Sequence, residues 1–323
     1  MLEDKGGGMK KIFIDGSAGT TGLRIRERLA ERQDIELVVL SEELRKDAQA
    51  RKDAINTSDI VFLCLPDDAA KESAGMVENP DTVLIDTSTA HRTAGGWVYG
   101  FPEIGGRREK IRTARKIANP GCHASGFISL TAPHTEAGVL KPDSRVSCFS
   151  LTGYSGGGKK MIADYESKEQ SPEQSRLLKG PRMYGLTQHH KHLPEMAKVC
   201  GLIYEPVFCP VVGDYYAGME VVVQLSAENC YAGVKEIAKI YREYYAEDKG
   251  GLVHFVDSAD EQGFMSAAAF AGRDDMQVSV LGNDDRILLV SRFDNLGKGA
   301  SGAAIQNMNL VMGIDETTGL VLA

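Results

Sequence analysis

The stretch KKIFIDGSAGTTGLRIRERLA, residues 10–30, decides the fold of the N-terminal part of the chain. Its apolar residues 12–14 predict a short buried strand, and the glycine-rich segment 16–22 predicts a tight turn. Apolar residues at helical spacing over 23–29 predict a helix, and a second strand is expected over 35–40. This order of strand, turn, helix and strand is typical of a βαβ unit that binds a dinucleotide.

The glycines of this turn are spaced G-x-x-G-x-x-G, which departs from the commoner G-x-G-x-x-G pattern. Because glycine has no Cβ, the backbone can approach a pyrophosphate, and the N–H groups that open the helix bind the anion. A turn that merely connects two elements is the alternative, but its place between a strand and a helix favours a cofactor site. The residues expected to contact the cofactor there are Gly16, Ser17, Gly19, Thr20, Thr21 and Gly22.

The second strand leads into the segment VVLSEELRKD, where an NAD site would place an acidic residue against the ribose hydroxyls. Ser41 comes first, and Arg45 lies close behind; a hydroxyl and a cation suit the 2′-phosphate of NADP(H). Glu42 and Glu43 favour NAD instead, and an exposed charged loop is a further alternative. The balance favours NADP(H).

The alternation of strands and helices continues to about residue 120 and predicts an α/β domain, a Rossmann-like doubly wound parallel sheet, over residues 9–120. From about 144 the strands are rich in β-branched residues, which predicts an α+β domain over 121–299. The small-residue helix within 300–323 is expected to pack back on the first domain. Residues 1–8 predict a disordered extension.

Composition limits the possible partners. The 323 residues carry a net charge of −8 without a long basic run, so we expect neither nucleic acid nor an anionic membrane as a partner. No apolar run approaches the ~18 residues that span a bilayer, and the polar start MLEDKGGG lacks a secretory hydrophobic region. The six cysteines form no C-x-x-C pair, which indicates reduced thiols in a cytoplasmic protein without a metal site.

The segment NPGCHASG, residues 119–126, carries the strongest chemical signal. Cys122 follows the end of a predicted strand and opens a predicted helix. The positive end of the helix dipole favours the thiolate, and the helix N–H groups can hold an oxyanion. A buried structural cysteine is the alternative. We expect Cys122 to be a nucleophile.

Three histidines cluster in QHHKHLPEM, residues 188–196. His190 and His192 face the same way if the backbone is extended, and Glu195 follows at the start of a helix. One of these histidines is expected to exchange protons with the substrate while Glu195 orients it. Packing or surface roles are the alternatives, and a metal site lacks further ligands at suitable spacing.

The segment TGYSGGGKK, residues 152–160, predicts a loop with exposed N–H groups that suits a phosphate or carboxylate. We expect no P-loop here, since both the spacing and the strand-to-helix context of that motif are absent from the predicted elements. A flexible hairpin is the alternative. A dinucleotide site combined with a nucleophilic cysteine and a histidine points to chemistry between an aldehyde and a thioester.

In the same order along residues 9–323, the chain resembles N-acetyl-gamma-glutamyl-phosphate reductases of the shorter, type 2 branch. The motifs that carry the resemblance are GSAGTTGLR, DTSTAHR, YGFPEI, ANPGCHASG, TGYSGGGK, HKHLPE and DNLGKGASGAAIQNMNLVMG. The chain departs from the longer branch after Cys122, where His123 stands in place of the usual aromatic residue.

The resemblance implies the NADPH-dependent reduction of N-acetyl-L-glutamyl 5-phosphate to its semialdehyde and phosphate, in arginine biosynthesis. Cys122 would form a thioester, and His192 or His190 would move the proton, with His192 preferred. It also implies a catalytic and dimerisation domain of the semialdehyde dehydrogenase type, in a homodimer or tetramer. Substrate-binding residues expected from these motifs are Ser155, Gly156, Arg92 and Glu195. The alternatives are related acyl-phosphate reductases, acting on aspartyl or aminoadipyl phosphate, and a non-catalytic dinucleotide-binding regulator.

Overall fold

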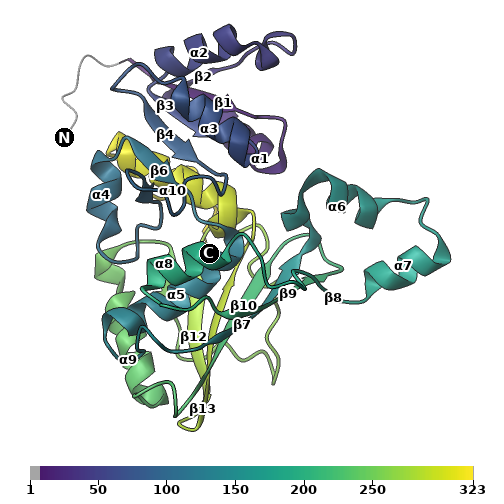
Figure 1. The fold of residues 1–323 in the computed structure, drawn as a ribbon, viewed down its shortest axis with the longest axis vertical. Helices are drawn as coiled ribbons and strands as arrows, with labels where there is room; N and C mark the ends of the chain where they lie inside the picture. Colours follow the sequence, from purple (N-terminus) through teal and green to yellow (C-terminus); the bar gives the residue numbers. More distant parts are fainter. Residues whose placement is uncertain (1–7, 323) are drawn as a thin grey trace. The chain divides into compact units, whose positions relative to one another are not determined.

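The computed structural model describes residues 8–322, which divide into two compact units (Figure 1). The disordered extension predicted for residues 1–8 lies, apart from Gly8, outside the described residues. Unit 1 holds the described residues up to Pro102, together with Gly106–Pro120 and Ala300–Leu320. Unit 2 holds Glu103–Gly105, Gly121–Gly299 and the described residues from Val321.

The sheet of unit 1 has six strands, all paired in parallel, in the order β2-β1-β3-β4-β6-β5. The strands are β1 (Lys10–Asp15), β2 (Ile35–Val38), β3 (Ile60–Leu63), β4 (Val83–Asp86), β5 (Val98–Tyr99) and β6 (Lys116–Ala118). The helices are α1 (Thr20–Ala30), the 3₁₀ turn η1 (Leu44–Lys46), α2 (Ala48–Thr57), α3 (Asp67–Gly75), α4 (Arg107–Thr113) and α10 (Gly302–Met312).

Alternate residues of β1, β3 and β4 enter two separate cores, one on each face of this sheet. In β1, Ile12 and Ile14 pack in a core that includes Ile25 of α1, whereas Phe13 packs in a core that includes Ile55 of α2. A parallel sheet with helices on both faces is the doubly wound arrangement predicted from the alternating pattern, which is thereby confirmed.

Helix α10 is the last helix of the chain and belongs to unit 1. Its residues Ile305 and Met308 lie in the same core as Ile12. Asn307 Nδ2 donates to the carbonyl oxygen of Gly100 at 2.9 Å, and a Cβ on Gly100 would lie 2.5 Å from that nitrogen. Gly100, which directly follows β5, therefore permits the close approach of α10.

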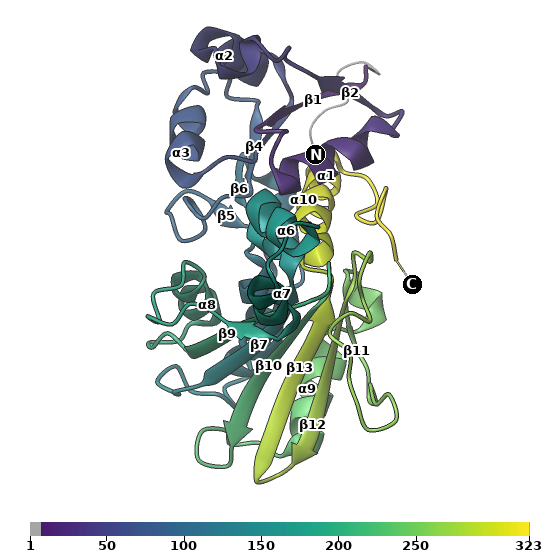
Figure 2. The same cartoon turned by 90° about the vertical axis from the view of Figure 1, so that its right-hand side faces the viewer.

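The sheet of unit 2 has seven strands in the order β11-β12-β13-β10-β7-β9-β8, and Figure 2 shows its longer strands side by side. It is mixed, because β7 and β9 pair in parallel, as do β11 and β12, while the other pairs are antiparallel. The strands are β7 (Ser147–Gly153), β8 (Arg182–Met183), β9 (Val207–Gly213), β10 (Met219–Ser226), β11 (Val253–Phe255), β12 (Met276–Asn283) and β13 (Arg286–Phe293). A mixed sheet of this kind agrees with the α+β domain predicted for this part of the chain.

Helix α5 (Cys122–Glu136) packs against β10 and β13 and is the central helix of unit 2. A Cβ on Gly126 would lie 2.4 Å from Val221 Cγ2 and 2.9 Å from Phe293 Cε1, so only glycine allows this approach of helix to sheet. The remaining helices are the 3₁₀ turn η2 (Tyr154–Gly157), α6 (Gly158–Glu166), α7 (Pro172–Lys179), α8 (Leu193–Cys200), α9 (Val234–Tyr244) and the 3₁₀ turn η3 (Glu247–Lys249). A π-helical turn, Gly297–Ser301, leads into α10.

Candidate active site

Cys122 is the first residue of α5, as the sequence predicted. Gly121 before it is extended, with φ −79° and ψ 147°, and no side chain caps the helix. The first intrahelical bond runs from Ser125 N to Gly121 O at 2.8 Å, so the N–H groups before Ser125 face out of the helix N-terminus. The partly exposed thiol therefore lies at the positive end of the helix dipole, where a thiolate is stabilised.

Two other segments of unit 2 hold the turn that carries Cys122. Glu195, in the first turn of α8 and only 1% exposed, accepts a hydrogen bond from Gly121 N at 3.3 Å. The backbone of Gly299 packs against Cys122, since a Cβ on that glycine would lie 3.0 Å from Cys122 Cβ. Glu195 thus bonds the backbone beside Cys122, while its predicted contact with substrate stays a prediction.

The loop between β8 and α8 carries the two histidines expected in the site. Gln188 fixes this loop to β9, because its Nε2 donates to Phe208 O at 2.7 Å and its Oε1 accepts from Phe208 N at 2.9 Å. His190 Nδ1 accepts from His192 N at 3.2 Å, and the two rings lie 4.7 Å apart, centroid to centroid. In the neutral ring of His190 this leaves the hydrogen on Nε2, so that nitrogen is a donor.

His123 is a member of the site that the sequence analysis did not assign. Its ring centroid lies 5.6 Å from those of both His190 and His192. Its Nδ1 lies 2.7 Å from Ser150 Oγ, and its Nε2 lies 2.5 Å from Tyr184 Oη. Burial, and then the neighbouring His190, lower the pKa of His123 to about 3, so the ring is neutral.

The sequence contained a signal for His123, but none for the two residues that contact its ring, Ser150 and Tyr184. His123 directly follows Cys122 and replaces the aromatic residue usual in the longer branch, and this departure was the signal for it. Ser150 lies on a buried strand, and Tyr184 follows a two-residue strand; neither stands in a pattern that predicts a site.

The glycine-rich segment after β7 differs from its predicted structure. The N–H groups of Gly153 and Ser155, expected to be exposed, donate to the carbonyl oxygens of Gly218 and Tyr216 at 3.0 Å each. Ser155 Oγ is also engaged, since it accepts from Asn295 Nδ2 at 2.9 Å, while Gly156 is exposed. The predicted absence of a strand-to-helix context was wrong, because β7 leads through η2 directly into α6. Two of the N–H groups predicted to bind an anion are nevertheless already hydrogen-bonded to the segment between β9 and β10.

The predicted dinucleotide turn joins β1 to α1 in unit 1. Gly16 has a φ of +92°, and a Cβ there would lie 2.3 Å from Cys64 O, so the turn requires glycine. A Cβ on Gly22 would lie 2.6 Å from Gly16 O. Gly19 is the N-cap of α1, which no side chain caps, and Thr20 and Thr21 open the helix. The turn has the narrow glycine cradle and open helix N-terminus that fit a pyrophosphate.

The residues predicted to recognise a 2′-phosphate lie after β2. Ser41 is exposed, and its carbonyl oxygen accepts from Leu44 N and Arg45 N at 3.1 and 3.0 Å. Arg45 forms an ion pair with Glu42 at 3.0 Å, with side chains 45% and 83% exposed. An exposed pair contributes about 0–1 kcal/mol, so a phosphate can compete for this guanidinium.

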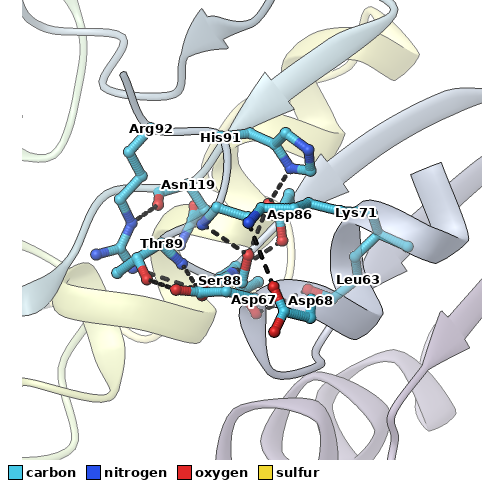
Figure 3. Close-up of polar contacts among 12 residues, drawn as sticks. Leu63, Asp67, Asp68, Lys71, Asp86, Ser88, Thr89, His91, Arg92 and Asn119 are labelled. Atoms are coloured by element: carbon cyan, nitrogen blue, oxygen red, sulfur yellow. Dashed lines mark hydrogen bonds and ion pairs between the residues drawn. The ribbon is translucent and has the colours of Figure 1, made fainter. Parts of the chain in front are cut away.

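Arg92 lies in a polar cluster at the carboxyl end of β4, shown in Figure 3. Asp86, fully buried, accepts from Ser88 Oγ at 2.8 Å and contacts His91 Nδ1 at 2.6 Å. Arg92 Nε donates to Asn119 O at 3.0 Å, and its Nη2 donates to Thr87 O at 3.2 Å. These contacts thus fix the loop after β4 and the Arg92 guanidinium within unit 1.

The part of the chain that the structure describes contains neither a metal-binding cluster nor a disulfide. Between residues 8 and 322, no three His, Cys, Asp or Glu side chains are arranged to hold a metal ion. The six cysteines, all of them described, form no disulfide. Over the same residues, no helix combines the length and apolar character needed to cross a membrane.

Comparisons with known proteins agree with this architecture. Residues 11–114 match the semialdehyde dehydrogenase NAD binding domain family, and residues 122–295 match the semialdehyde dehydrogenase dimerisation domain family. Among solved structures, aspartate semialdehyde dehydrogenase II from Vibrio cholerae matches with a TM-score of 0.71 at 17% identity, covering 95% of this chain and 99% of that chain. The aspartate semialdehyde dehydrogenase from Candida albicans matches with a TM-score of 0.67 at 16% identity, covering 94% and 99%. These structures support the fold alone.

Curated relatives are far more similar in sequence. The N-acetyl-gamma-glutamyl-phosphate reductase 2 of Nostoc sp. (strain PCC 7120) is 44% identical over 319 residues, covering 96% of this chain and 99% of that protein. The N-acetyl-gamma-glutamyl-phosphate reductase of Mesorhizobium japonicum is 43% identical over 311 residues, covering 94% and 99%. With both semialdehyde dehydrogenase domains present, the chain belongs to the N-acetyl-gamma-glutamyl-phosphate reductase family.

Proposed function

We propose that this protein reduces N-acetyl-L-glutamyl 5-phosphate to N-acetyl-L-glutamate 5-semialdehyde and phosphate, a reaction of arginine biosynthesis. Family membership supports the substrate. The single observation that supports the chemistry is the position of Cys122 as the first residue of the uncapped helix α5. A thiolate is favoured there, and the adjacent N–H groups can hold the oxyanion that its attack creates.

In the first step the Cys122 thiolate attacks the acyl carbon, and the bond to the phosphate oxygen breaks. Inorganic phosphate leaves, and a thioester joins the substrate to Cys122. Addition of hydride to the thioester carbon places a negative charge on its oxygen. Collapse of this thiohemiacetal anion forms the aldehyde and expels the thiolate, so Cys122 is regenerated.

The negative oxygen needs donors, and unit 2 supplies two kinds. The N–H groups of the first turn of α5 are one, and Nε2–H of His190 is the other. His190 is half-buried, whereas His192 is only 5% exposed, so we assign this role to His190, although the sequence favoured His192. His190→Asn should therefore lower kcat more than His192→Asn does.

NADPH, when bound, supplies the hydride. The glycine cradle and the open N-terminus of α1 fit its pyrophosphate, and we assign Gly16, Ser17, Gly19, Thr20, Thr21 and Gly22 to this contact. Ser41 and Arg45 are assigned to the 2′-phosphate, because they are exposed in the segment that follows β2.

The anionic groups of the substrate are assigned to Arg92 and Gly156. Arg92 is held by two backbone carbonyls, which fixes the orientation of its planar guanidinium. Gly156 is exposed next to Ser155, whose hydroxyl is held by Asn295. We assign Ser155 to shaping this loop, and Glu195 to the neighbourhood of the acetamide.

We also infer a homo-oligomer. The match to a dimerisation domain supports it, and so does the outer face of the unit 2 sheet. Phe149, Leu151 and Val222 are only partly buried on this face, and Leu288 is 38% exposed. Partly exposed apolar side chains on a sheet face are found at interfaces between copies of a chain. Whether the assembly is a dimer or a tetramer is decided by its mass in solution.

The decisive assay runs the reaction in reverse. The protein is mixed with N-acetyl-L-glutamate 5-semialdehyde, phosphate and NADP⁺, and nicotinamide absorbance is followed, with aspartate semialdehyde as the parallel substrate. Phosphate-dependent reduction of NADP⁺ with the first substrate alone is expected. Activity with aspartate semialdehyde alone would retain the thioester chemistry and overturn the substrate.

Cys122→Ser is the matched control for this assay. It should abolish turnover and leave NADP⁺ binding, measured by fluorescence titration, unchanged. Substantial residual turnover would contradict the assignment of Cys122 as nucleophile.

A further inference from the structure

A cluster of three polar side chains lies beside the glycine turn between β1 and α1 in unit 1. Asp15 is the last residue of β1, Arg51 lies in α2, and Ser73 lies in α3. Asp15 is 3% exposed, Ser73 is 0% exposed, and the side chain of Arg51 is 12% exposed. The cluster therefore joins one strand and two helices in the interior of unit 1.

Each member of this cluster bonds the other two. Arg51 Nε donates to Asp15 Oδ1 at 3.2 Å, and Arg51 Nη2 donates to Asp15 Oδ2 at 3.0 Å. Arg51 Nη2 also donates to Ser73 Oγ, and the Ser73 hydroxyl donates to Asp15 Oδ2 at 2.8 Å. Both carboxylate oxygens of Asp15 are thus held, in a geometry that uses the planar fork of the guanidinium.

Stability alone does not explain a buried ion pair at this place. Taking two charges out of water costs free energy that their attraction often only balances, so apolar side chains would serve a core equally well. Phe13, two residues earlier on β1, is such a side chain, since it packs in one core with Ile55 of α2 and Ala70 of α3. Asp15 meets the same two helices with a charge, which directs attention to the geometry that the ion pair enforces.

The segment whose geometry depends on Asp15 is the glycine turn. Asp15 directly precedes Gly16, whose φ is +92° and where a Cβ would lie 2.3 Å from Cys64 O. Cys64 N donates to Asp15 O at 2.8 Å, and Gly19 N donates to Gly16 O at 3.1 Å. Asp15 is therefore the residue at which the turn leaves the sheet, with its backbone bonded to the segment after β3 and its side chain bonded to α2 and α3.

We propose that Arg51 and Ser73 position the glycine turn for the cofactor by holding Asp15, so that the N–H groups at the start of α1 meet the pyrophosphate. Arg51 and Ser73 are positioning residues, because they act through Asp15 and do not touch the cofactor. The inference deepens the proposed function, on whose dinucleotide site it rests. A turn already held in its binding shape loses less conformational freedom when the ligand arrives, and this preorganisation raises affinity.

Titration calorimetry with NADP⁺ tests this role without turnover. Ser73→Ala removes the hydroxyl between the carboxylate and the guanidinium, and it is expected to raise the dissociation constant of NADP⁺ about 3- to 10-fold, as the loss of one hydrogen bond would. Ser73→Thr retains the hydroxyl and should restore the original constant. In steady-state kinetics Ser73→Ala should raise KM for NADPH and leave kcat at saturating NADPH nearly unchanged.

Arg51→Lys separates geometry from charge. It retains the cation but replaces the fork by one ammonium group, which does not reproduce the bonds to both Asp15 oxygens and to Ser73. The dissociation constant of NADP⁺ should therefore rise at least as much as in Ser73→Ala. Arg32→Lys is the matched control, because Arg32 forms a similar fork, to Asp34 and Asn309, beyond the far end of α1, and it should leave the constant unchanged.

A second ligand shows which part of the cofactor site is affected. Adenosine 2′-monophosphate carries the base and the 2′-phosphate but no pyrophosphate, so Ser73→Ala and Arg51→Lys should bind it as the unaltered protein does. Equal weakening of both ligands would overturn the proposal, because the cluster would then support unit 1 in general.

The outcomes separate this inference from the proposed function. If the unaltered protein does not bind NADP⁺, the dinucleotide site itself is wrong, and the cofactor assignment of the proposed function fails with it. If the unaltered protein binds NADP⁺, and Ser73→Ala and Arg51→Lys, folded by circular dichroism, bind it equally well, the positioning role is overturned and the dinucleotide site stands.

Discussion

Glu195 accepts the backbone N–H of Gly121 at 3.3 Å, so a buried carboxylate of α8 holds the residue that immediately precedes Cys122. A negative charge beside a thiolate does not by itself favour the thiolate. Its value here is geometric, because the bond fixes the turn from which α5 begins. Cys122 is thereby positioned by a residue distant in sequence, and Glu195 can be tested in that role.

Glu195→Ala is expected to lower kcat by roughly 10- to 100-fold, because displacing a reacting atom by about 1 Å has an effect of that size. Glu195→Gln keeps an acceptor oxygen and should retain most of the activity. Steady-state kinetics separates this role from substrate binding. If both variants raise KM for the acyl substrate and leave kcat unchanged, Glu195 contacts the substrate instead.

A buried ion pair between Lys298 and Glu103 gives a prediction about stability. Lys298 Nζ contacts the two carboxylate oxygens of Glu103 at 2.8 and 2.9 Å, and the side chains are 2% and 3% exposed. Lys298→Met leaves the carboxylate buried without its cation and should lower the free energy of unfolding by about 3–5 kcal/mol. Urea denaturation followed by circular dichroism measures this loss.

Two further variants control for this result. Replacing both partners, as Lys298→Met with Glu103→Gln, should recover part of the loss, because no buried charge then remains. Removing the exposed pair through Lys10→Met, whose partner is Asp59, should change the free energy of unfolding by less than about 1 kcal/mol. Equal losses at the two pairs would contradict the explanation from burial.

His134 makes stability depend on pH. Its ring is fully buried in α5 against Tyr241, and neither ring nitrogen has a hydrogen-bond partner in the described part of the chain. Burial lowers the pKa of His134 from 6.5 to about 3. Below pH 6.5 the unfolded chain takes up a proton that the folded chain refuses, so stability present above pH 6.5 is lost as the pH falls toward 3.

The expected slope from His134 is about 1.4 kcal/mol per pH unit within that window. His134→Phe keeps an aromatic ring against Tyr241 and should reduce the slope of unfolding free energy against pH by that amount. His254, which is exposed, supplies the control, and His254→Phe should leave the slope unchanged. A slope unaffected by His134→Phe would show that the folded protein accepts the proton.

Local signals made part of this structure predictable from the sequence. The turn between β1 and α1 depends on glycines within seven consecutive positions, and Gly16 and Gly22 are the residues where a Cβ would collide with backbone. The place of Cys122 at a helix start followed from Pro120 and Gly121 before it and small residues after it.

Contacts between distant segments were not predictable in the same way. His123 meets Ser150 and Tyr184, which are 27 and 61 positions away, and these contacts depend on how β7 and β8 are placed in the sheet. The N–H groups of Gly153 and Ser155 were wrongly predicted to be exposed for the same reason. Gly153 pairs with Gly218, a residue 65 positions away that no local pattern connects with it.

Cofactor preference is the last property that follows from named side chains. Arg45 forms only an exposed pair with Glu42, so its guanidinium can bind a 2′-phosphate at little cost. A charge-assisted hydrogen bond is worth about 1.5–3 kcal/mol, which corresponds to roughly 10- to 100-fold in affinity. Ser41→Ala with Arg45→Ala should therefore raise KM for NADPH by about that factor and leave KM for NADH nearly unchanged.

Glu42→Ala provides the opposing variant, because it removes the competitor for Arg45 and should lower KM for NADPH. Lys10→Ala controls for the loss of a surface cation elsewhere in unit 1, and it should change KM for NADPH and KM for NADH equally. Initial rates with each cofactor at saturating acyl substrate give these constants. Equal increases in KM for NADPH and NADH in the Ser41 and Arg45 double variant would place the 2′-phosphate away from this loop. Any preference for NADP(H) would then depend on other residues.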